Sequence, residues 1–170
     1  MPEGVRMSAT TAFLSTLSIG IGATLVMDLW TLMLKRIGVA TLNYAMVGRW
    51  VGHMGHGHLR HEAIAKAAPI RHERALGWLM HYATGLAFAA LLVSLAGEAW
   101  LSSPTLWPAL AFGLCSVVAP LCFMQPALGA GFFASRTPKP LVSCLRSVAT
   151  HMVFGVGLFL SAMLVQAGPW

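Results

Sequence analysis

Three residues that can ionise lie inside long apolar stretches of the sequence: Asp28, His81 and His151. Two imidazoles and one carboxylate are a common ligand set for zinc or non-haem iron, and they leave coordination positions open for water or substrate. A carboxylate beside a histidine also forms a hydrogen-bonded clamp, which can relay protons without a metal. Two histidines alone can ligate a haem iron from opposite sides. The residue types therefore fit three alternatives: a divalent-metal site, a clamp or proton relay, and a haem site.

The positions of these residues favour a shared site. Asp28 stands six residues before the end of one apolar stretch, whereas His81 and His151 each stand six residues after the start of another. At 1.5 Å of rise per helical residue, each lies about 9 Å from the same boundary. Tyr82 and Gln125 are placed to join this site from its edges.

A second group of ionisable residues occupies the segment HMGHGHLRH, from His53 to His61. Its spacing matches no standard zinc motif. The segment is either a solvated loop whose charge changes near a pKa of about 6.5, or a cap that supplies His53 or His61 as extra metal ligands. Arg49, which precedes it, has the planar donor group that suits a carboxylate or a phosphate.

The composition shows which solvent surrounds these residues. Hydrophobic residues make up 57% of the 170 residues, charged residues 9%, and the mean hydropathy is +0.72. A soluble domain usually carries about 25% charged residues, so most of this surface must face lipid. The net charge of +6 does not indicate nucleic-acid binding, because the basic residues lie between apolar stretches and no nucleic-acid motif is present.

Four apolar stretches are long enough to cross a bilayer as helices, the only open-ended structure that satisfies its backbone in lipid. The sequence thus predicts an all-α, integral membrane four-helix bundle that forms a single membrane domain over residues 1–170. A loop over residues 35–74 is expected to hold short interfacial helices near residues 41–54 and 59–68. The predicted spans are residues 12–34, 75–95, 106–124 and 145–165.

The basic residues predict an orientation. Apart from Arg6, every Lys and Arg falls in the segments 35–74 and 136–146, and the turn over residues 96–105 has none. Because positive loops remain in the cytoplasm, both segments are expected there, with both termini on the extracytoplasmic, or periplasmic, side.

Five segments together resemble a family of small bacterial inner-membrane proteins that is defined only as a domain of unknown function. The resemblance extends over nearly the whole chain, and it implies four membrane helices and a bacterial inner membrane but no activity. The segments are ATLVMDLW (residues 23–30), GRW (48–50), GWLMHYATG (77–85), MQPALGAG (124–131) and RSVATHMVFGVGL (146–158).

These observations lead to several functional hypotheses. The first is a cytoplasm-facing site of Asp28, His81 and His151 that binds a divalent metal, zinc or iron. The second is a non-enzymatic accessory or assembly protein whose Asp–His cluster is a structural clamp or proton relay. A bis-histidine haem bundle and a small transporter are the remaining alternatives. The lipid bilayer is the expected partner, together with a second copy of the chain or another membrane protein, and the sequence does not decide whether the protein is an enzyme.

Overall fold

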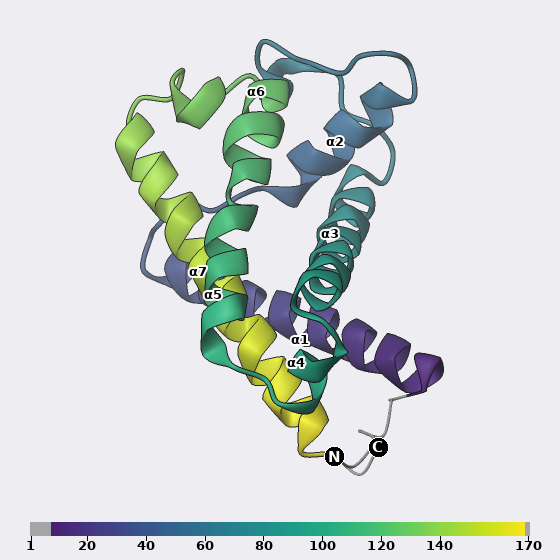
Figure 1. The fold of residues 1–170 in the computed structure, drawn as a ribbon. Helices are drawn as coiled ribbons and strands as arrows, with labels where there is room; N and C mark the ends of the chain where they lie inside the picture. Colours follow the sequence, from purple (N-terminus) through teal and green to yellow (C-terminus); the bar gives the residue numbers. More distant parts are fainter. Residues whose placement is uncertain (1–7, 169–170) are drawn as a thin grey trace, which may run out of the picture.

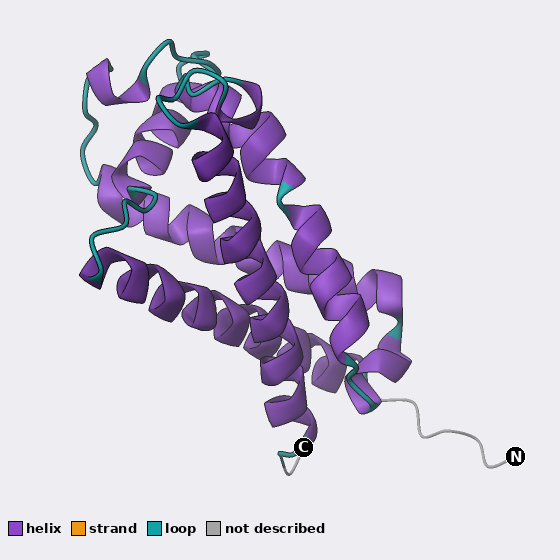
Figure 2. Cartoon of the chain, turned by 90° about the vertical axis from the view of Figure 1, so that its left-hand side faces the viewer, coloured by secondary structure: helices purple, strands orange, loops and turns teal. Residues whose placement is uncertain are grey.

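A computed structural model describes residues 8–168, which fold into helices and connecting loops without a strand (Figures 1 and 2). Four helical stretches are long and apolar enough to cross a membrane, so the predicted fold class is confirmed. Each extends beyond its predicted bounds at one end or both. They are α1 (Ala9–Arg36), α3 (Glu73–Ala96), the third span (Leu106–Leu128) and α7 (Pro140–Gln166).

The third span is interrupted by a wide turn. It consists of α5 (Leu106–Ser116), the π-helical turn η2 (Ala119–Met124) and α6 (Gln125–Leu128). Proline has no N–H to donate, so Pro120 breaks the regular ladder, and the backbone N–H of Gln125 reaches five residues back to the Pro120 carbonyl. The helix therefore continues past the predicted end at residue 124, until Gly129 ends it with a left-handed conformation (φ 97°).

Shorter elements connect the spans. They are α2 (Tyr44–Met54), the single turns η1 (Ile64–Lys66) and η3 (Phe132–Ala134), and α4 (Glu98–Ser102). The side chain of Asn43 caps α2 by accepting from the Ala45 N–H, which agrees with the predicted helix near residues 41–54. The predicted helix over residues 59–68 is wrong except for η1. Backbone groups there bond elsewhere: the His61 N–H donates to the Ala127 carbonyl, and carbonyls near η1 accept from Arg49.

One end of the bundle carries the basic residues. α2, α6 and the loops around them lie at this end, whereas α4, the start of α1 and the end of α7 lie at the other (Figure 1). We call it the basic end, because every Lys and Arg of residues 8–168 belongs to the segments 35–74 and 136–146 that form it. The two-ended distribution of charge is typical of a multi-pass membrane protein.

Small residues allow the long helices to approach one another closely. A Cβ atom added at Gly113 in α5 would lie 2.6 Å from the His151 carbonyl oxygen in α7, and one at Gly155 would lie 2.7 Å from the Ala109 oxygen. Close backbone contact through small residues is how membrane helices gain packing energy without a hydrophobic driving force. Large apolar side chains such as Leu79 and Leu164 remain exposed and face the lipid.

The tightest contact joins α2 to the first turns of α3. A Cβ atom at Gly48 would overlap the Glu73 carbonyl group, and one at Gly77 would overlap the Tyr44 carbonyl group. The two helix backbones thus touch at these glycines. This contact places Tyr44, the first residue of α2, beside Gly77 and His81 near the start of α3.

Replacing Gly77 by alanine is predicted to destabilise the fold. Alanine is intrinsically better than glycine in a helix by about 1 kcal/mol, but overpacking a backbone contact typically costs about 1–3 kcal/mol, so the overlap with Tyr44 should dominate. We expect Gly77→Ala to lower the free energy of unfolding, measured by titration with a denaturing detergent. Gly55→Ala is the matched control, because its added Cβ has only an ordinary neighbour at 3.4 Å. Equal stability of both variants would contradict the proposed contact.

Candidate functional site

The structure places Asp28 of α1 against His81 of α3. Asp28 Oδ1 lies 2.9 Å from His81 Nε2, and the two side chains are only 17% and 11% exposed, respectively. An ionisable pair inside a membrane helix bundle is stable only when its members satisfy each other. This contact is therefore the centre of the polar cluster inside the bundle.

Two tyrosines complete the surroundings of this pair. The Tyr82 hydroxyl donates to Asp28 Oδ2 at 2.9 Å, and the Tyr44 hydroxyl lies 3.0 Å from His81 Nε2. The Tyr44 ring also packs on Trp78, with 4.5 Å between the ring centroids. Burial, together with the nearby Asp28 carboxylate, raises the pKa of the Tyr44 hydroxyl well above its usual range, so this hydroxyl stays protonated at neutral pH.

The geometry of this cluster restricts where its protons can lie. One nitrogen, His81 Nε2, is shared between the Asp28 carboxylate and the Tyr44 hydroxyl. When Nε2 carries a proton it donates to Asp28, and when it does not it accepts from Tyr44. Both contacts use the same nitrogen, so the other ring nitrogen, Nδ1, remains for a different partner. The cluster can therefore act as a clamp and can also move a proton along this short chain.

His151 lies in a separate hydrogen bond. Its Nδ1 is 2.7 Å from the Ser116 hydroxyl of α5, which also donates to the Gly113 carbonyl. In residues 8–168, no group of three or more His, Cys, Asp or Glu side chains is arranged to hold a metal ion. A metal or haem site built from Asp28, His81 and His151 therefore remains a prediction.

His81 and His151 nevertheless line the same cavity, of about 280 Å³, which we call the inner cavity. Its other walls are mainly apolar and come from α1, α2, α3, the π-helical turn and α7. They include Met27, Val47, Trp50, Val51, Phe88 and Phe154.

A second cavity, of about 320 Å³, adjoins the inner cavity nearer the basic end, and we call it the outer cavity. Its lining has more polar residues, although it keeps apolar ones too, and the polar residues include Thr31, Thr41, Gln125, Ser143, Arg146, Ser147 and Thr150. Six residues line both cavities, so the two spaces are neighbours with a common wall: Met27, Leu42, Tyr44, Pro120, Met124 and His151.

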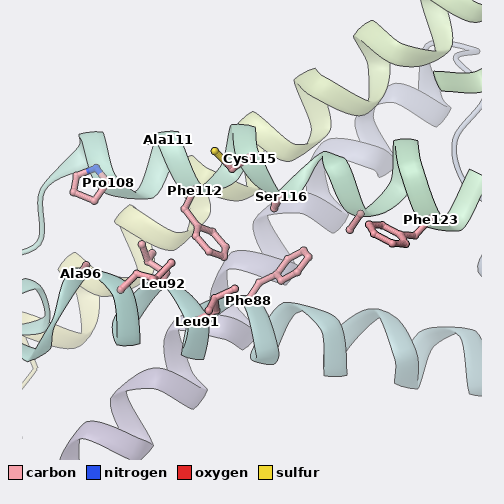
Figure 3. A pocket seen from close by; sticks show the side chains of 12 residues that line it. Phe88, Leu91, Leu92, Ala96, Pro108, Ala111, Phe112, Cys115, Ser116 and Phe123 are labelled. Atoms are coloured by element: carbon pink, nitrogen blue, oxygen red, sulfur yellow. The ribbon is translucent and has the colours of Figure 1, made fainter. Parts of the chain in front are cut away.

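An apolar groove of about 560 Å³ runs between α3 and α5 (Figure 3). The side chains of Leu92 and Phe112 point into the space between the two helices. Phe88, Ala119 and Phe123 line both this groove and the inner cavity, so the inner cavity borders the lipid-facing side of the bundle at these three residues.

Two buried polar atoms of the outer cavity's lining have no hydrogen-bond partner. They are the hydroxyl oxygen of Thr41 and Oε1 of Gln125, whose amide nitrogen makes only a long bond of 3.4 Å to Ser147. Buried polar atoms without a partner are uncommon in folded proteins and need an explanation. Both residues line the outer cavity, so a turn of either side chain would bring its polar atom to a polar molecule bound there.

Comparison with known proteins gives a family but no function. The model of a family described as "Protein of unknown function (DUF2938)" matches residues 17–165. The chain belongs to the DUF2938 family. The match includes parts of all four spans and every residue of the polar cluster. No curated protein and no solved structure matches the chain.

In this DUF2938 protein, Arg49 belongs to a different cluster from Asp28 and His81. Its guanidinium binds both carboxylate oxygens of Glu73 at 2.9 Å and donates to the carbonyls of Ile64 and Ala67. The bond to Glu73 raises the pKa of Arg49 further above its usual value, so the charge is permanent. Arg49 thus ties α2 to the start of α3 and to η1, instead of offering its donors to a ligand.

The histidine-rich segment folds back on α2. Nδ1 of His53 lies 2.8 Å from Nε2 of His61, and the Trp50 indole donates to the Leu59 carbonyl. His61 Nδ1 is buried without a partner. These hydrogen bonds hold the segment as a loop against α2. His53 and His61 are not among the residues that line the inner cavity.

Sequence reasoning missed several residues of this arrangement. The sequence predicts Tyr44 only as part of a short interfacial helix, and it gives no signal for the roles of Ser116 and Thr41. Their positions depend on contacts between residues far apart in the chain, for which the sequence gives no local signal. Arg146 belongs to the basic segment 136–146 that predicts the orientation, but its place in the outer cavity requires the fold.

Removing a single side-chain group of the polar cluster, which consists of Asp28, His81, Tyr82 and Tyr44, is predicted to lower the free energy of unfolding. Interhelical hydrogen bonds in membrane proteins contribute about 0.6 kcal/mol on average and up to about 1.7 kcal/mol. We expect Tyr82→Phe to lower the free energy of unfolding by about this amount, and Asp28→Ala to lower it further, because His81 and Tyr82 both lose their partner. Ser94→Ala serves as the control, since that hydroxyl bonds only its own helix. Asp28→Ala with wild-type stability would contradict a clamp.

The histidine loop is predicted to loosen in acid. Burial, and then the neighbouring His53 and His58, lower the pKa of His61 below its usual 6.5. Below about pH 6.5 the unfolded loop therefore binds more protons than the folded loop, so stability is full above this pH and declines as the pH falls. Hydrogen exchange of residues 55–72, corrected for intrinsic rates, should show less protection at low pH.

His61→Gln should flatten this pH dependence, whereas His56→Gln, at an exposed site, should leave it unchanged. Protection that is independent of pH in the wild-type protein would contradict the assignment.

Proposed function

We propose that this protein binds a small amphipathic molecule inside the membrane, with the apolar part in the inner cavity and the polar part in the outer cavity. The observation that carries the proposal is the pairing of an apolar cavity with an adjoining, more polar one through six shared lining residues. Ligand sites in proteins are usually cavities with mostly apolar walls and a few converging polar groups.

The polar groups at the common wall support this reading. Tyr44 and His151 line both cavities, and His81 lines the inner one. The bonds to Asp28 and Ser116 use one nitrogen of each histidine ring and leave the other nitrogen available. Asp28 and Ser116 therefore orient two imidazoles, and that of His151, which lines both cavities, is placed to bind the polar part of a ligand.

The position of the inner cavity supports access from the bilayer. Its border with the groove consists of Phe88, Ala119 and Phe123, and the groove itself is apolar. A molecule dissolved in lipid can reach this border without leaving an apolar environment. The proposed ligand is therefore one that partitions into membranes.

The proposal includes a location and an orientation. We place the protein in a bacterial inner membrane with the basic end, and thus the outer cavity, on the cytoplasmic side. The support is the concentration of Lys and Arg in the segments 35–74 and 136–146, since positive loops remain on that side. Both termini then lie on the opposite side.

A second candidate function is metal binding. It is favoured by one observation, that His81 and His151 line one cavity and that imidazole is a ligand for zinc and iron. Protein purified without a histidine tag would then contain about one metal ion per chain, lost in His81→Ala and His151→Ala. Under the amphipathic-ligand proposal the metal content of all three samples is equal and far below one per chain.

Binding to the inner cavity is predicted to quench Trp50. The probe is a bromine-tipped octanol added to protein in phosphatidylcholine nanodiscs, because bromine quenches only indoles that it contacts. We expect saturable quenching that disappears in Trp50→Phe. Val51→Phe, which fills the inner cavity, should weaken the apparent affinity by at least about fivefold, or about 1 kcal/mol.

The matched control is Leu79→Phe, which introduces the same side chain on the lipid-facing surface of α3, where Leu79 is 64% exposed. It should bind the probe as the wild-type protein does. Quenching that is linear in probe concentration, or unchanged in Val51→Phe, would refute the proposal.

A further inference from the structure

We infer that the outer cavity selects an anionic head group, a phosphate or a carboxylate, with Arg146 as its counter-charge. This inference rests on the proposed function and specifies its ligand class. Arg146 lines the outer cavity in the second turn of α7, together with the unpartnered polar atoms of Thr41 and Gln125.

Arg146 carries an uncompensated charge. One of its terminal nitrogens, Nη1, donates to the Ala40 carbonyl at 2.7 Å, which holds the guanidinium against the loop between α1 and α2. The ion pairs of residues 8–168 are those of Arg49 with Glu73 and of His81 with Asp28, so none of them neutralises Arg146. The other N–H groups of its planar fork suit the oxygens of a phosphate or a carboxylate.

The neighbouring polar groups can add donors. The Thr41 hydroxyl is free to donate, since it makes no hydrogen bond in the structure. The Gln125 amide, rotated by half a turn, would accept from the Ser147 hydroxyl and turn its NH₂ group toward the place of the unpartnered oxygen. With the side chains of Thr41 and Gln125 turned toward the cavity, they and Arg146 present donors from the loop before α2, from α6 and from α7.

The charges around the outer cavity favour an anion over a cation. Ten basic residues belong to the segments that form the basic end. Of the acidic residues nearby, Asp28 is bound by His81 and Tyr82, and Glu73 is bound by Arg49. Only Glu62 of these segments has no such partner among the ion pairs of residues 8–168. The resulting positive potential concentrates anions at the mouth of the cavity.

The test compares molecules that differ only in the head group. In the test, octyl phosphate and octanol are added as competitors to protein in phosphatidylcholine nanodiscs whose Trp50 is quenched by the bromine-tipped octanol. Inorganic phosphate is added in a separate sample as a third competitor. We expect octyl phosphate to bind at least about tenfold more tightly than octanol to the wild-type protein. Arg146→Gln should bring the two affinities close together, and Arg146→Lys, which keeps the charge but not the fork, should retain part of the difference.

Arg74→Gln is the matched control, because it removes the same charge from an exposed position at the basic end that lines neither cavity. It should preserve the preference for octyl phosphate. An equal loss in Arg74→Gln and Arg146→Gln would mean that only general surface charge is sensed, which overturns the inference. If Arg146→Gln does not fold, a reduced preference in Arg146→Lys, with octanol binding unchanged, supports the inference, and an undiminished preference in that variant overturns it.

The outcomes separate this inference from the proposed function. Failure of every probe to bind overturns the proposed function and the inference together. Equal binding of octanol and octyl phosphate to the wild-type protein leaves the proposed function standing and overturns the anionic head group. If inorganic phosphate, added without octyl phosphate, displaces the probe, the natural ligand's anionic group can be a free phosphate. If octyl phosphate displaces the probe and inorganic phosphate does not, the anionic group belongs to a lipid-like molecule.

Discussion

The backbone contact between α2 and the first turns of α3 is the constraint on which the rest of the site depends. Gly48 and Gly77 permit it, and the two-pronged pair of Arg49 with Glu73 holds it from the side. Only in this position can Tyr44 reach His81, and only then do residues of α2 become a wall of the inner cavity. Although α2 is too short to cross the membrane, it therefore supplies a tyrosine of the polar cluster and one wall of the inner cavity.

Neutralisation of charge organises the basic end. Transferring an unpaired charge into a bundle of apolar helices is costly, so Asp28 and Glu73 each have a cationic or hydrogen-bonding partner from a different element. Arg146 stands apart, since its fixed bond goes to a neutral carbonyl. The polar side chains beside the inner cavity therefore have hydrogen-bond partners within the protein, whereas polar groups of the outer cavity's lining remain without one.

Much of the fold followed from composition, because a chain with 9% charged residues must place its long apolar stretches in lipid. The equal depths of Asp28 and His81 on neighbouring helices also pointed to a shared site. The partners of these residues could not be predicted. The approach of α2 to α3 arises from tertiary packing, as does the bond between His151 and Ser116. Residues 59–68 did not form the expected helix because their carbonyls bind Arg49, an interaction between residues that are far apart in the sequence.

The π-helical turn at Ala119–Met124 has a consequence for selectivity. Pro120 has no N–H to donate, so this part of the third span is held by fewer regular backbone bonds than its neighbours, and it supplies Pro120, Phe123 and Met124 to the cavity walls. Under the proposed function, a wall of this kind adapts to hydrocarbon chains of different length or branching, whereas at the other end the guanidinium of Arg146 is held by its bond to the Ala40 carbonyl. If the proposed ligand binds, its selection would then depend more on its head group than on the shape of its hydrocarbon.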